Sequence, residues 1–305
     1  MNTLSMSELD LVDHYRSRGD RKAQLVDRLD PVVYASDITS SPIKPSLVEQ
    51  YRKNGFLILE NIFNEDEVTA LELELDRLRK SSVIRALNET ITEPSSGEIR
   101  SIFRPHDISE VFKKLAADQR LAGLAQYLLD DQVYIHQSRL NYKPGFHGKE
   151  FYWHSDFETW HVEDGMPKMR ALSMSVTLTD NITSNGPLML IPGSHKHYVV
   201  CEGETPDNHF KTSLKKQEYG VPSEACLGQL VGNGGIVTAT GKPGSVIIFD
   251  CNTMHCSNSN ITPYPRSNAF FVYNAVSNRV VEPFGNQPPR PEYICSRKTI
   301  EAIQG

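Results

Sequence analysis

Long hydrophobic runs are missing from this chain. Nowhere in its 305 residues do about eighteen apolar residues follow one another, so we expect no membrane-spanning helix. Residues Met1–Asp20 are polar and charged throughout, so we expect no signal peptide. With 39% hydrophobic and 23% charged residues, the composition is that of an ordinary globular protein.

Cysteine is scarce, and its odd number and wide spacing argue against a disulfide framework. They favour a reducing cytoplasm. Zinc is an alternative because two cysteines flank His255, but no C-x-x-C pair accompanies them and we expect no zinc site. The five cysteines are Cys201, Cys226, Cys251, Cys256 and Cys295.

Neither sign of charge is in large excess, since the formal net charge is −6. This value argues against a dedicated nucleic-acid binder. We expect neither nucleic acid nor a membrane as partner, and self-association to a homodimer is left open. The length allows one large domain or two ordinary ones, and the sequence has no internal repeat or low-complexity segment.

One aromatic-rich stretch, Phe151–Trp160, carries the most chemistry. His154 and Asp156 stand two apart in it, and the aromatic residues favour an extended strand. On a strand, residues i and i+2 point to the same face, so the imidazole and the carboxylate would project together. Two histidines and one carboxylate form the facial triad that holds Fe(II) and leaves positions open for substrates.

The third ligand has to come from elsewhere, and His255 is the candidate because it follows a strongly apolar strand at 245–250. Arg266 lies eleven residues further on, where a guanidinium could grip a carboxylate with two parallel hydrogen bonds. The alternatives are a surface His-Asp pair, a core histidine and a surface arginine. His161, His195 and His197 are interpreted as structural.

The rest of the chain predicts helices first and strands later. Residues 1–30 are interpreted as a solvated polar arm with a helical-looking piece around residues 7–29. Helices are expected at 44–55, 64–78 and 115–129. The strand at 133–142 places Gln137, Arg139 and Asn141 on one polar face, which suits a ligand-filled cavity or, alternatively, an edge strand facing solvent.

Short strands with turns between them across 133–276 suggest a β-sandwich or barrel braced by helices. Residues 201–235 are interpreted as a polar insertion with little readable chemistry, and the proline-rich tail as irregular.

The motifs quoted above, together with the segment from Asn185-Gly186-Pro187-Leu188 to Pro192-Gly193-Ser194-His195, resemble those of the phytanoyl-CoA-dioxygenase-like group. That resemblance implies a mainly β fold with flanking helices and a double-stranded β-helix (jelly-roll, cupin-type) core. It further implies one oxygenase domain over 31–305, with its core at about 133–276. Fe(II) would be held by His154, Asp156 and His255, and 2-oxoglutarate and O₂ would be co-substrates. Residues implied to bind 2-oxoglutarate are Arg266, Ser257, Asn141, Phe151, Ser173 and Arg139.

The blocks Gln137–Gly145 and Phe151–Arg170 closely resemble the ectoine-hydroxylating branch of that group. The resemblance implies ectoine, a small cyclic amidine with a carboxylate, as substrate. Its product would be 5-hydroxyectoine, a compatible solute used under osmotic stress. The side chains expected to contact ectoine are Gln137, Trp160, Thr159, Phe270 and Arg290. Alternatives are a sister hydroxylase of another amino-acid-like molecule and a metal-binding jelly roll without turnover.

Overall fold

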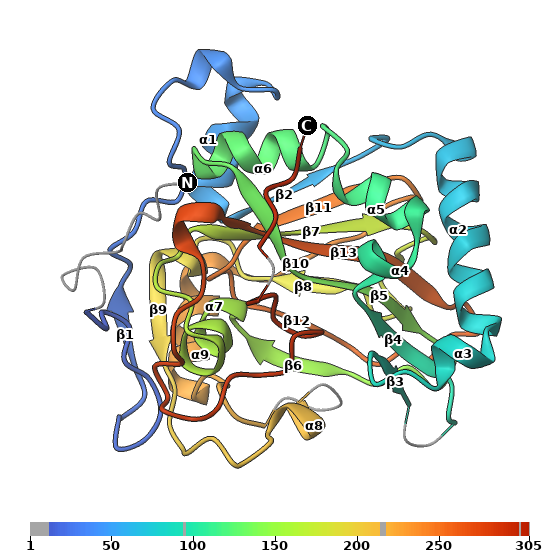
Figure 1. The fold of residues 1–305 in the computed structure, drawn as a ribbon. Coiled ribbons are helices and arrows are strands. Elements are labelled where there is room, and N and C mark those ends of the chain that lie inside the picture. Colours follow the sequence, from blue (N-terminus) through green and yellow to red (C-terminus); the bar gives the residue numbers. More distant parts are fainter. Residues whose placement is uncertain (1–11, 94–95, 214–217, 299, 305) are drawn as a thin grey trace.

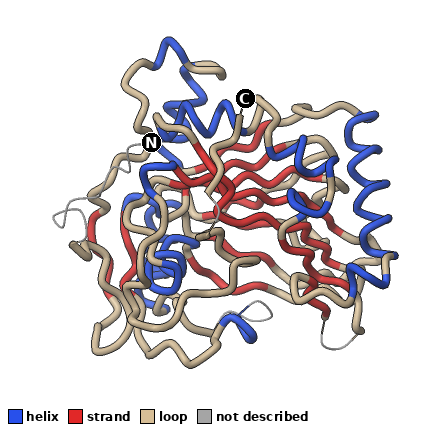
Figure 2. The backbone as a smooth tube through the Cα atoms, viewed as in Figure 1, coloured by secondary structure: helices blue, strands red, loops and turns tan. Residues whose placement is uncertain are grey.

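The structure is a computed structural model that describes residues 12–93, 96–213, 218–298 and 300–304 (Figure 1). Strands fill its centre and most helices lie toward the outside (Figure 2). A seven-stranded sheet has the order β2-β11-β7-β13-β5-β4-β3, and a four-stranded sheet has the order β10-β8-β12-β6. Strands β1 and β9 form a separate pair. All the strand pairings in the described residues are antiparallel.

The large sheet is built from seven segments that span most of the chain. Its strands are β2 (Phe56–Leu59), β11 (Val246–Asp250), β7 (Ala171–Thr177), β13 (Arg266–Ala275), β5 (Val133–Lys143), β4 (Ile99–Phe103) and β3 (Thr90–Thr92). The predicted strand at 133–142 is confirmed as β5. Because β2, β3 and β4 belong to this sheet, the β core begins well before residue 133, contrary to the expected core boundary.

The smaller sheets are made of short strands. These are β10 (Val237–Thr238), β8 (Leu188–Leu190), β12 (His255–Ser257) and β6 (Phe151–His154), with β1 (Gln24–Asp27) and β9 (His197–Val200) forming the separate pair. Helix α9 (Glu224–Gly234) and the single turn α8 (Phe210–Ser213) lie in the segment interpreted as an insertion.

Two helices begin and end where local signals predicted. In α2 (Glu65–Lys80), the Asn64 side chain accepts from the Glu67 amide while the Glu67 carboxylate accepts from the Asn64 amide, which forms a capping box. Helix α1 (Pro45–Asn54) ends at Gly55, whose φ of 83° suits glycine best. The other predicted helix, 115–129, is in fact two, α5 (Glu110–Ala116) and α6 (Ala122–Leu129), with a turn between them. Short helices α3 (Ser82–Arg85) and α4 (Pro105–Ile108) complete this layer.

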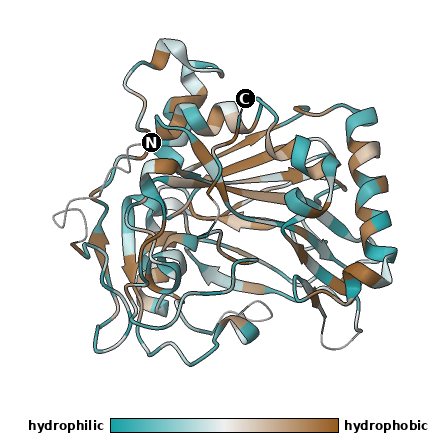
Figure 3. Cartoon of the chain, in the orientation of Figure 1, coloured by the Kyte–Doolittle hydropathy of each residue, from teal (hydrophilic) through white to brown (hydrophobic). Residues whose placement is uncertain are grey.

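The large sheet has two different faces because side chains alternate along its strands. Met174, Val176, Ile248 and Phe271 pack with residues of α1, α2, α5 and α6 in one hydrophobic core. Apolar residues accordingly concentrate on these strands (Figure 3). The opposite face carries Ser173 and Ser175 of β7, and it is the face that turns toward the small sheet and the candidate site.

Residues 12–30 are not a solvated helical arm, so that interpretation is wrong for the part that the structure describes. Strand β1 pairs with β9, and Tyr15 and Arg18 are buried. The local pattern could not reveal this, because the partners of these residues lie more than a hundred positions away in the sequence. Residues 1–11 lie outside the described residues. No described helix combines the length and apolar character needed to cross a membrane.

Candidate active site

Three side chains predicted as metal ligands meet at one end of the cavity between the sheets. His154 ends β6, His255 begins β12, and these two residues are register partners in the small sheet. The Nε2 atoms of His154 and His255 lie 3.7 and 3.8 Å from Oδ1 of Asp156. One potential ligand atom from each residue lies within 4.8 Å of the others. The spacing leaves room for one shared metal ion.

The local geometry differs from the continuous strand expected over Phe151–Trp160. Strand β6 stops at His154, and Ser155 caps the four-residue helix α7 (Asp156–Thr159) by accepting from the Glu158 amide. A π-helical turn, Trp160–Asp164, follows directly. Asp156 therefore reaches His154 across a strand-to-helix turn and not by strand parity. A Ser-x-x-Glu pattern at 155–158 was the signal that predicts this helix start.

Hydrogen bonds fix both imidazoles in the orientation that a metal requires. Nδ1 of His154 lies 2.7 Å from the Tyr152 carbonyl, and Nδ1 of His255 lies 2.9 Å from the Thr253 carbonyl. A carbonyl only accepts, so each Nδ1 carries a hydrogen and each Nε2, the nitrogen nearer Asp156, is the one that a metal would bind. Burial, followed by the neighbouring His255, lowers the pKa of His154 to about 3, which keeps the ring neutral.

Asp156 is held in turn by Ser173, whose hydroxyl donates to Oδ2 at 3.2 Å. Ser173 of strand β7 was expected to contact 2-oxoglutarate, which stays a prediction; in the structure it contacts Asp156, a predicted metal ligand. Such an outer hydrogen bond is typical of a metal site.

A second cluster in the described residues, His136, Asp164 and Cys295, also brings possible ligand atoms within 4.8 Å of one another. Here Arg290 already grips Asp164 with two hydrogen bonds, at 2.7 and 2.5 Å. Burial alone would raise the pKa of Asp164, but the charge and hydrogen bonds of Arg290 outweigh the effect of burial and lower this pKa to about 2. The guanidinium supplies the positive charge that a metal would bring, so this cluster suits an internal ion pair.

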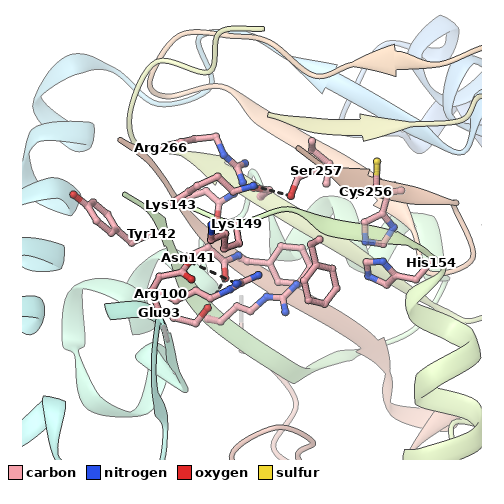
Figure 4. A pocket seen from close by; sticks show the side chains of 18 of the residues that line it. Glu93, Arg100, Asn141, Tyr142, Lys143, Lys149, His154, Cys256, Ser257 and Arg266 are labelled. Atoms are coloured by element: carbon pink, nitrogen blue, oxygen red, sulfur yellow. Dashed lines mark hydrogen bonds and ion pairs between the residues drawn. The ribbon is translucent and has the colours of Figure 1, made fainter. Parts of the chain in front are cut away.

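The cavity extends from the histidines toward a strongly basic end (Figure 4). Its lining includes Arg100, Arg139, Lys143, Lys149 and Arg266, against which Glu93 is the one carboxylate among the described lining residues. Arg100 lies 3.5 Å from Glu93. The remaining cations create a site with a surplus of positive charge, which suits an anion with more than one carboxylate.

Arg266 is the strongest indication of an anion-binding site. It is buried, it has no carboxylate partner within the described part of the chain, and its Nε atom has no hydrogen-bond partner. Burial lowers its pKa to about 10. Nearby, Lys143 Nζ donates to the Ser257 hydroxyl at 3.0 Å, and burial followed by the charge of Arg266 lowers its pKa well below the usual range. A buried cation without a partner is costly, and a bound carboxylate would relieve that cost.

The other residues expected at the 2-oxoglutarate site also line the cavity. Phe151 packs edge-on against the His154 ring, with centroids 4.9 Å apart. The Asn141 amide oxygen accepts from Ser101, and Arg139 stacks over the Phe270 ring at 4.5 Å from its centroid. Asn141, Phe151, Ser257, Arg139, Arg266 and Phe270 all belong to the lining.

Four residues expected to contact ectoine lie behind this lining. Gln137 donates to the Ile294 carbonyl at 2.8 Å, and Arg290 is paired with Asp164. Trp160 is 3% exposed and packs edge-on against His136, whereas the Thr159 hydroxyl is buried without a partner. Their roles in substrate binding stay predictions.

Sequence reasoning missed Lys143 and Arg100. A signal for Lys143 was available, because it continues the alternation of Gln137, Arg139 and Asn141 by one further step. Arg100 had no such signal, since it enters the cavity from β4, a strand that the polar segment 89–103 did not predict.

The fold and the site together define a jelly-roll protein with one mononuclear metal site beside a buried anion site. The family model described as phytanoyl-CoA dioxygenase (PhyH) matches residues 51–268, and the chain belongs to this family. The expected double-stranded β-helix fold is confirmed by solved structures.

More specifically, the chain is similar to ectoine dioxygenases along nearly its whole length. It is 57% identical to that of Sphingopyxis alaskensis over 292 residues, which cover 96% of this chain and 95% of the relative. The identity to the Stutzerimonas stutzeri protein is 53% over 291 residues, or 95% and 96% of the two chains.

The structure of EctD from S. alaskensis with 2-oxoglutarate and 5-hydroxyectoine matches with a TM-score of 0.87 at 52% identity, covering 96% of this chain and 97% of that chain. Its form with bound Fe also matches with a TM-score of 0.87, at 51% identity, covering 96% and 98%.

Proposed function

We propose that this protein is an Fe(II)- and 2-oxoglutarate-dependent dioxygenase that hydroxylates ectoine to 5-hydroxyectoine, with release of succinate and CO₂. The observation that carries the proposal is the joint presence of a His-Asp-His ligand set and an unpaired buried arginine in one cavity. Similarity to ectoine dioxygenases over 96% of the chain supports the choice of substrate.

The donor set fits Fe(II). His154 and His255 would each offer a neutral Nε2, and Asp156 would offer a carboxylate oxygen, which leaves the remaining positions for exogenous ligands. Bound iron would supply the activation of O₂ that couples oxidative decarboxylation of 2-oxoglutarate to hydroxylation of ectoine. The protein's part is to orient both imidazoles, which the Tyr152 and Thr253 carbonyls do by accepting from Nδ1.

The basic end of the cavity fits the distal carboxylate of 2-oxoglutarate. Arg266 would form a charge-assisted, two-pronged contact, and Lys143 and Ser257 would add donors beside it. Arg139 also lines this cavity, where burial lowers its pKa and the charge of Asp156 opposes that shift. A dianion spanning these cations would be oriented toward the metal at its other end.

For ectoine, the place of Phe270 in the cavity lining supports an aromatic contact with the delocalised amidine cation. Gln137, Trp160, Thr159 and Arg290 would join once the tail around Ile294, which Gln137 now contacts, yields to substrate. The product is a compatible solute, which assigns the enzyme to the response to osmotic stress.

The test is incubation of the protein with Fe(II), ascorbate, 2-oxoglutarate and ectoine, followed by measurement of succinate and 5-hydroxyectoine. Equimolar formation of both is expected. His154→Ala, Asp156→Ala and His255→Ala should remain folded, lose bound iron and form neither product. Succinate produced only with another amino-acid-like substrate, such as proline, would favour a sister hydroxylase. Iron binding without any succinate would favour a binding module.

We also infer one oxygenase domain over residues 31–305. The described segment 12–30 packs against it. Five cysteines that are all free and buried support a reducing compartment such as the cytoplasm. We further propose that the protein self-associates to a homodimer. Light scattering of the purified protein tests this.

A further inference from the structure

Residues 13–30 contact the two chain segments that carry the predicted metal ligands Asp156 and His255. In Figure 1 their strand β1 lies beside β9, on the same side of the molecule as α7. Two buried arginines of this segment, Arg18 and Arg28, face the two chain segments that deliver Asp156 and His255. No role follows for either arginine from the reaction proposed above.

Arg18 binds the helical segment that begins with Asp156. Its Nε and Nη2 atoms donate to the two carboxylate oxygens of Glu158 at 2.9 and 2.7 Å, and Nη1 donates to Glu163 at 2.7 Å. Ser17 adds a hydrogen bond to Glu158 at 2.8 Å. Both carboxylates are almost fully buried, at 1% and 2% exposed. One guanidinium therefore spans both α7 and the π-helical turn after it.

Backbone hydrogen bonds also hold the chain at Arg18. Its φ of 64° lies in the left-handed region, which is unfavourable for a residue with a side chain. Its amide donates to the Cys201 carbonyl at 2.9 Å, and the next amide, of Gly19, donates to Gly203 at 2.8 Å. Tertiary contacts thus hold a conformation that the isolated segment would avoid.

Arg28 binds the turn that leads into His255. Its Nη1 atom donates to Asp250 at 2.7 Å, and Asp250 in turn accepts from the Asn252 amide at 2.9 Å. Its remaining N–H groups reach the carbonyls of Asp30, Pro31 and Met169. The turn that Arg28 holds also includes Thr253, whose carbonyl orients His255.

The two ligand segments are linked to each other and to the same N-terminal residues. The Phe157 amide donates to the Cys251 carbonyl at 2.8 Å, which ties α7 to the His255 turn. Tyr15 packs edge-on against Phe157, with ring centroids 5.2 Å apart. Asp13 lies 3.0 Å from Nε2 of His161 in the π-helical turn.

We propose that residues 13–30 form a positioning strap that holds Asp156 and His255 at the separation a metal requires, with Arg18 and Arg28 as its positioning residues. A helix of four residues has no stability of its own, so α7 depends on tertiary contacts for its place. The strap supplies these contacts at Glu158, two residues beyond the ligand. This inference rests on the metal site of the proposed function.

The test compares metal binding by the wild type, Arg18→Gln and Arg18→Lys. Apo proteins are titrated anaerobically with Fe(II), and the visible spectrum of each Co(II)-loaded form reports the ligand geometry. Arg18→Gln is expected to bind Fe(II) at least tenfold more weakly and to show an altered Co(II) spectrum. Arg18→Lys is expected to recover part of the affinity, because one charged contact survives.

Arg170→Gln serves as the matched control, because Arg170 also ties segments together through carbonyls and Asp131 but contacts neither ligand segment. It is expected to lower the melting temperature without changing metal affinity or spectrum. A folded Arg18→Gln protein with wild-type affinity and an unchanged spectrum would overturn the strap. Failure of the wild type itself to bind metal would instead overturn the proposed function.

Removing Arg18 alone takes the guanidinium from two buried carboxylates, which keep only Ser17 at Glu158 and His209 at Glu163 among the contacts described, and this endangers folding. The triple variant Arg18→Met, Glu158→Gln, Glu163→Gln removes the charges together and is expected to fold. It should still bind Fe(II) at least tenfold more weakly, because the guanidinium link is gone. Wild-type affinity in this variant would show that the ion pairs do not position the ligands.

Discussion

At the scale of single residues, a buried arginine with an internal carboxylate partner has a structural role, whereas one without such a partner is a candidate for ligand binding. Arg18, Arg28 and Arg290 each meet a carboxylate within 2.7 Å, so their charges are neutralised inside the protein. Arg266 is as deeply buried, yet it faces the cavity without such a partner in the described residues. Since a folded protein rarely leaves a buried charge unpaired, the unpaired one marks the place of an external anion.

Replacing Arg266 should therefore affect the co-substrate selectively. We expect Arg266→Ala to raise the KM for 2-oxoglutarate strongly, since loss of one partner of a buried charge pair costs about 2–5 kcal/mol. The KM for ectoine should change far less. Steady-state titration of both substrates checks this. An unchanged KM for 2-oxoglutarate would assign the anchoring role to Lys143 or Arg139.

The burial of His195, a residue interpreted as structural, predicts how the free energy of unfolding depends on pH. His195 is buried with Nε2 donating to the Arg52 carbonyl at 3.2 Å, and burial lowers its pKa to about 4 from an ordinary value of 6.5. Between these values the unfolded chain binds the proton and the folded protein does not. The stabilisation is thus complete above pH 6.5 and is lost as the pH falls toward 4.

His195→Gln should flatten this dependence by up to one proton, or about 1.4 kcal/mol per pH unit at most. Denaturant unfolding of the apo protein at several pH values between 4 and 7 measures the slope. Equal slopes for wild type and His195→Gln would show that His195 titrates alike in both states.

At the scale of elements, the strand-to-helix junction at Ser155 decides which residues face the cavity. A strand continued to residue 160 would have aligned Trp160 with His154, but the helical turn carries the indole into a core with Phe157, Met166 and Val272. Trp160 consequently has two competing roles, as a core residue and as the aromatic face for ectoine. Gln137 and Arg290 share this ambiguity, because Gln137 already donates to the Ile294 carbonyl and Arg290 already pairs with Asp164.

Trp160 substitutions separate these roles. We expect Trp160→Ala to destabilise the protein by about 3–5 kcal/mol, as large-to-small changes of buried aromatics do. If the indole also covers the amidine, ectoine binding should weaken at least tenfold, and Trp160→Phe should lose less in both measurements.

Denaturant unfolding gives the stability, and anaerobic calorimetry with Fe(II) and 2-oxoglutarate present gives the ectoine affinity. Ectoine-independent decarboxylation should persist or rise in both variants. Wild-type ectoine affinity in a folded Trp160→Ala protein would restrict the indole to the core.

At the scale of the whole molecule, the site lies where the two sheets approach each other. The large sheet contributes Arg139, Asn141 and Arg266, the small sheet contributes His154 and His255, and α7 contributes Asp156. Ligands that bind between the sheets should therefore stabilise the complete fold, because they bind only the folded state.

Thermal unfolding makes this coupling measurable. A metal such as Mn(II), together with 2-oxoglutarate at about 100 times its Kd, should add about 2.7 kcal/mol and raise the melting temperature by roughly 4 °C. Removal of the metal with EDTA should reverse the shift. Arg266→Ala should keep the response to metal and lose most of the response to 2-oxoglutarate. A full response to 2-oxoglutarate in Asp156→Ala without metal would contradict the common site.

The sequence by itself determined those features whose signals are local. The boundaries of α1 and α2 follow from Gly55 and from the Asn64 capping box, because capping acts within four residues. The alternation in β5 predicted the polar face that Arg139 and Asn141 present to the cavity, because strand parity needs no distant partner. Residue types and spacing also identified the three possible metal ligands and Arg266.

Only the tertiary structure decided how these residues meet. Helix α7 replaces the expected strand because Ser155 caps it and Arg18, about 140 residues away in the chain, holds Glu158. The same contact ties the expected polar arm to the domain through the buried Arg18, and Asp164 is the internal partner of Arg290. Burial and pairing of charge depend on which distant segments come together, and that is set by packing of the whole chain.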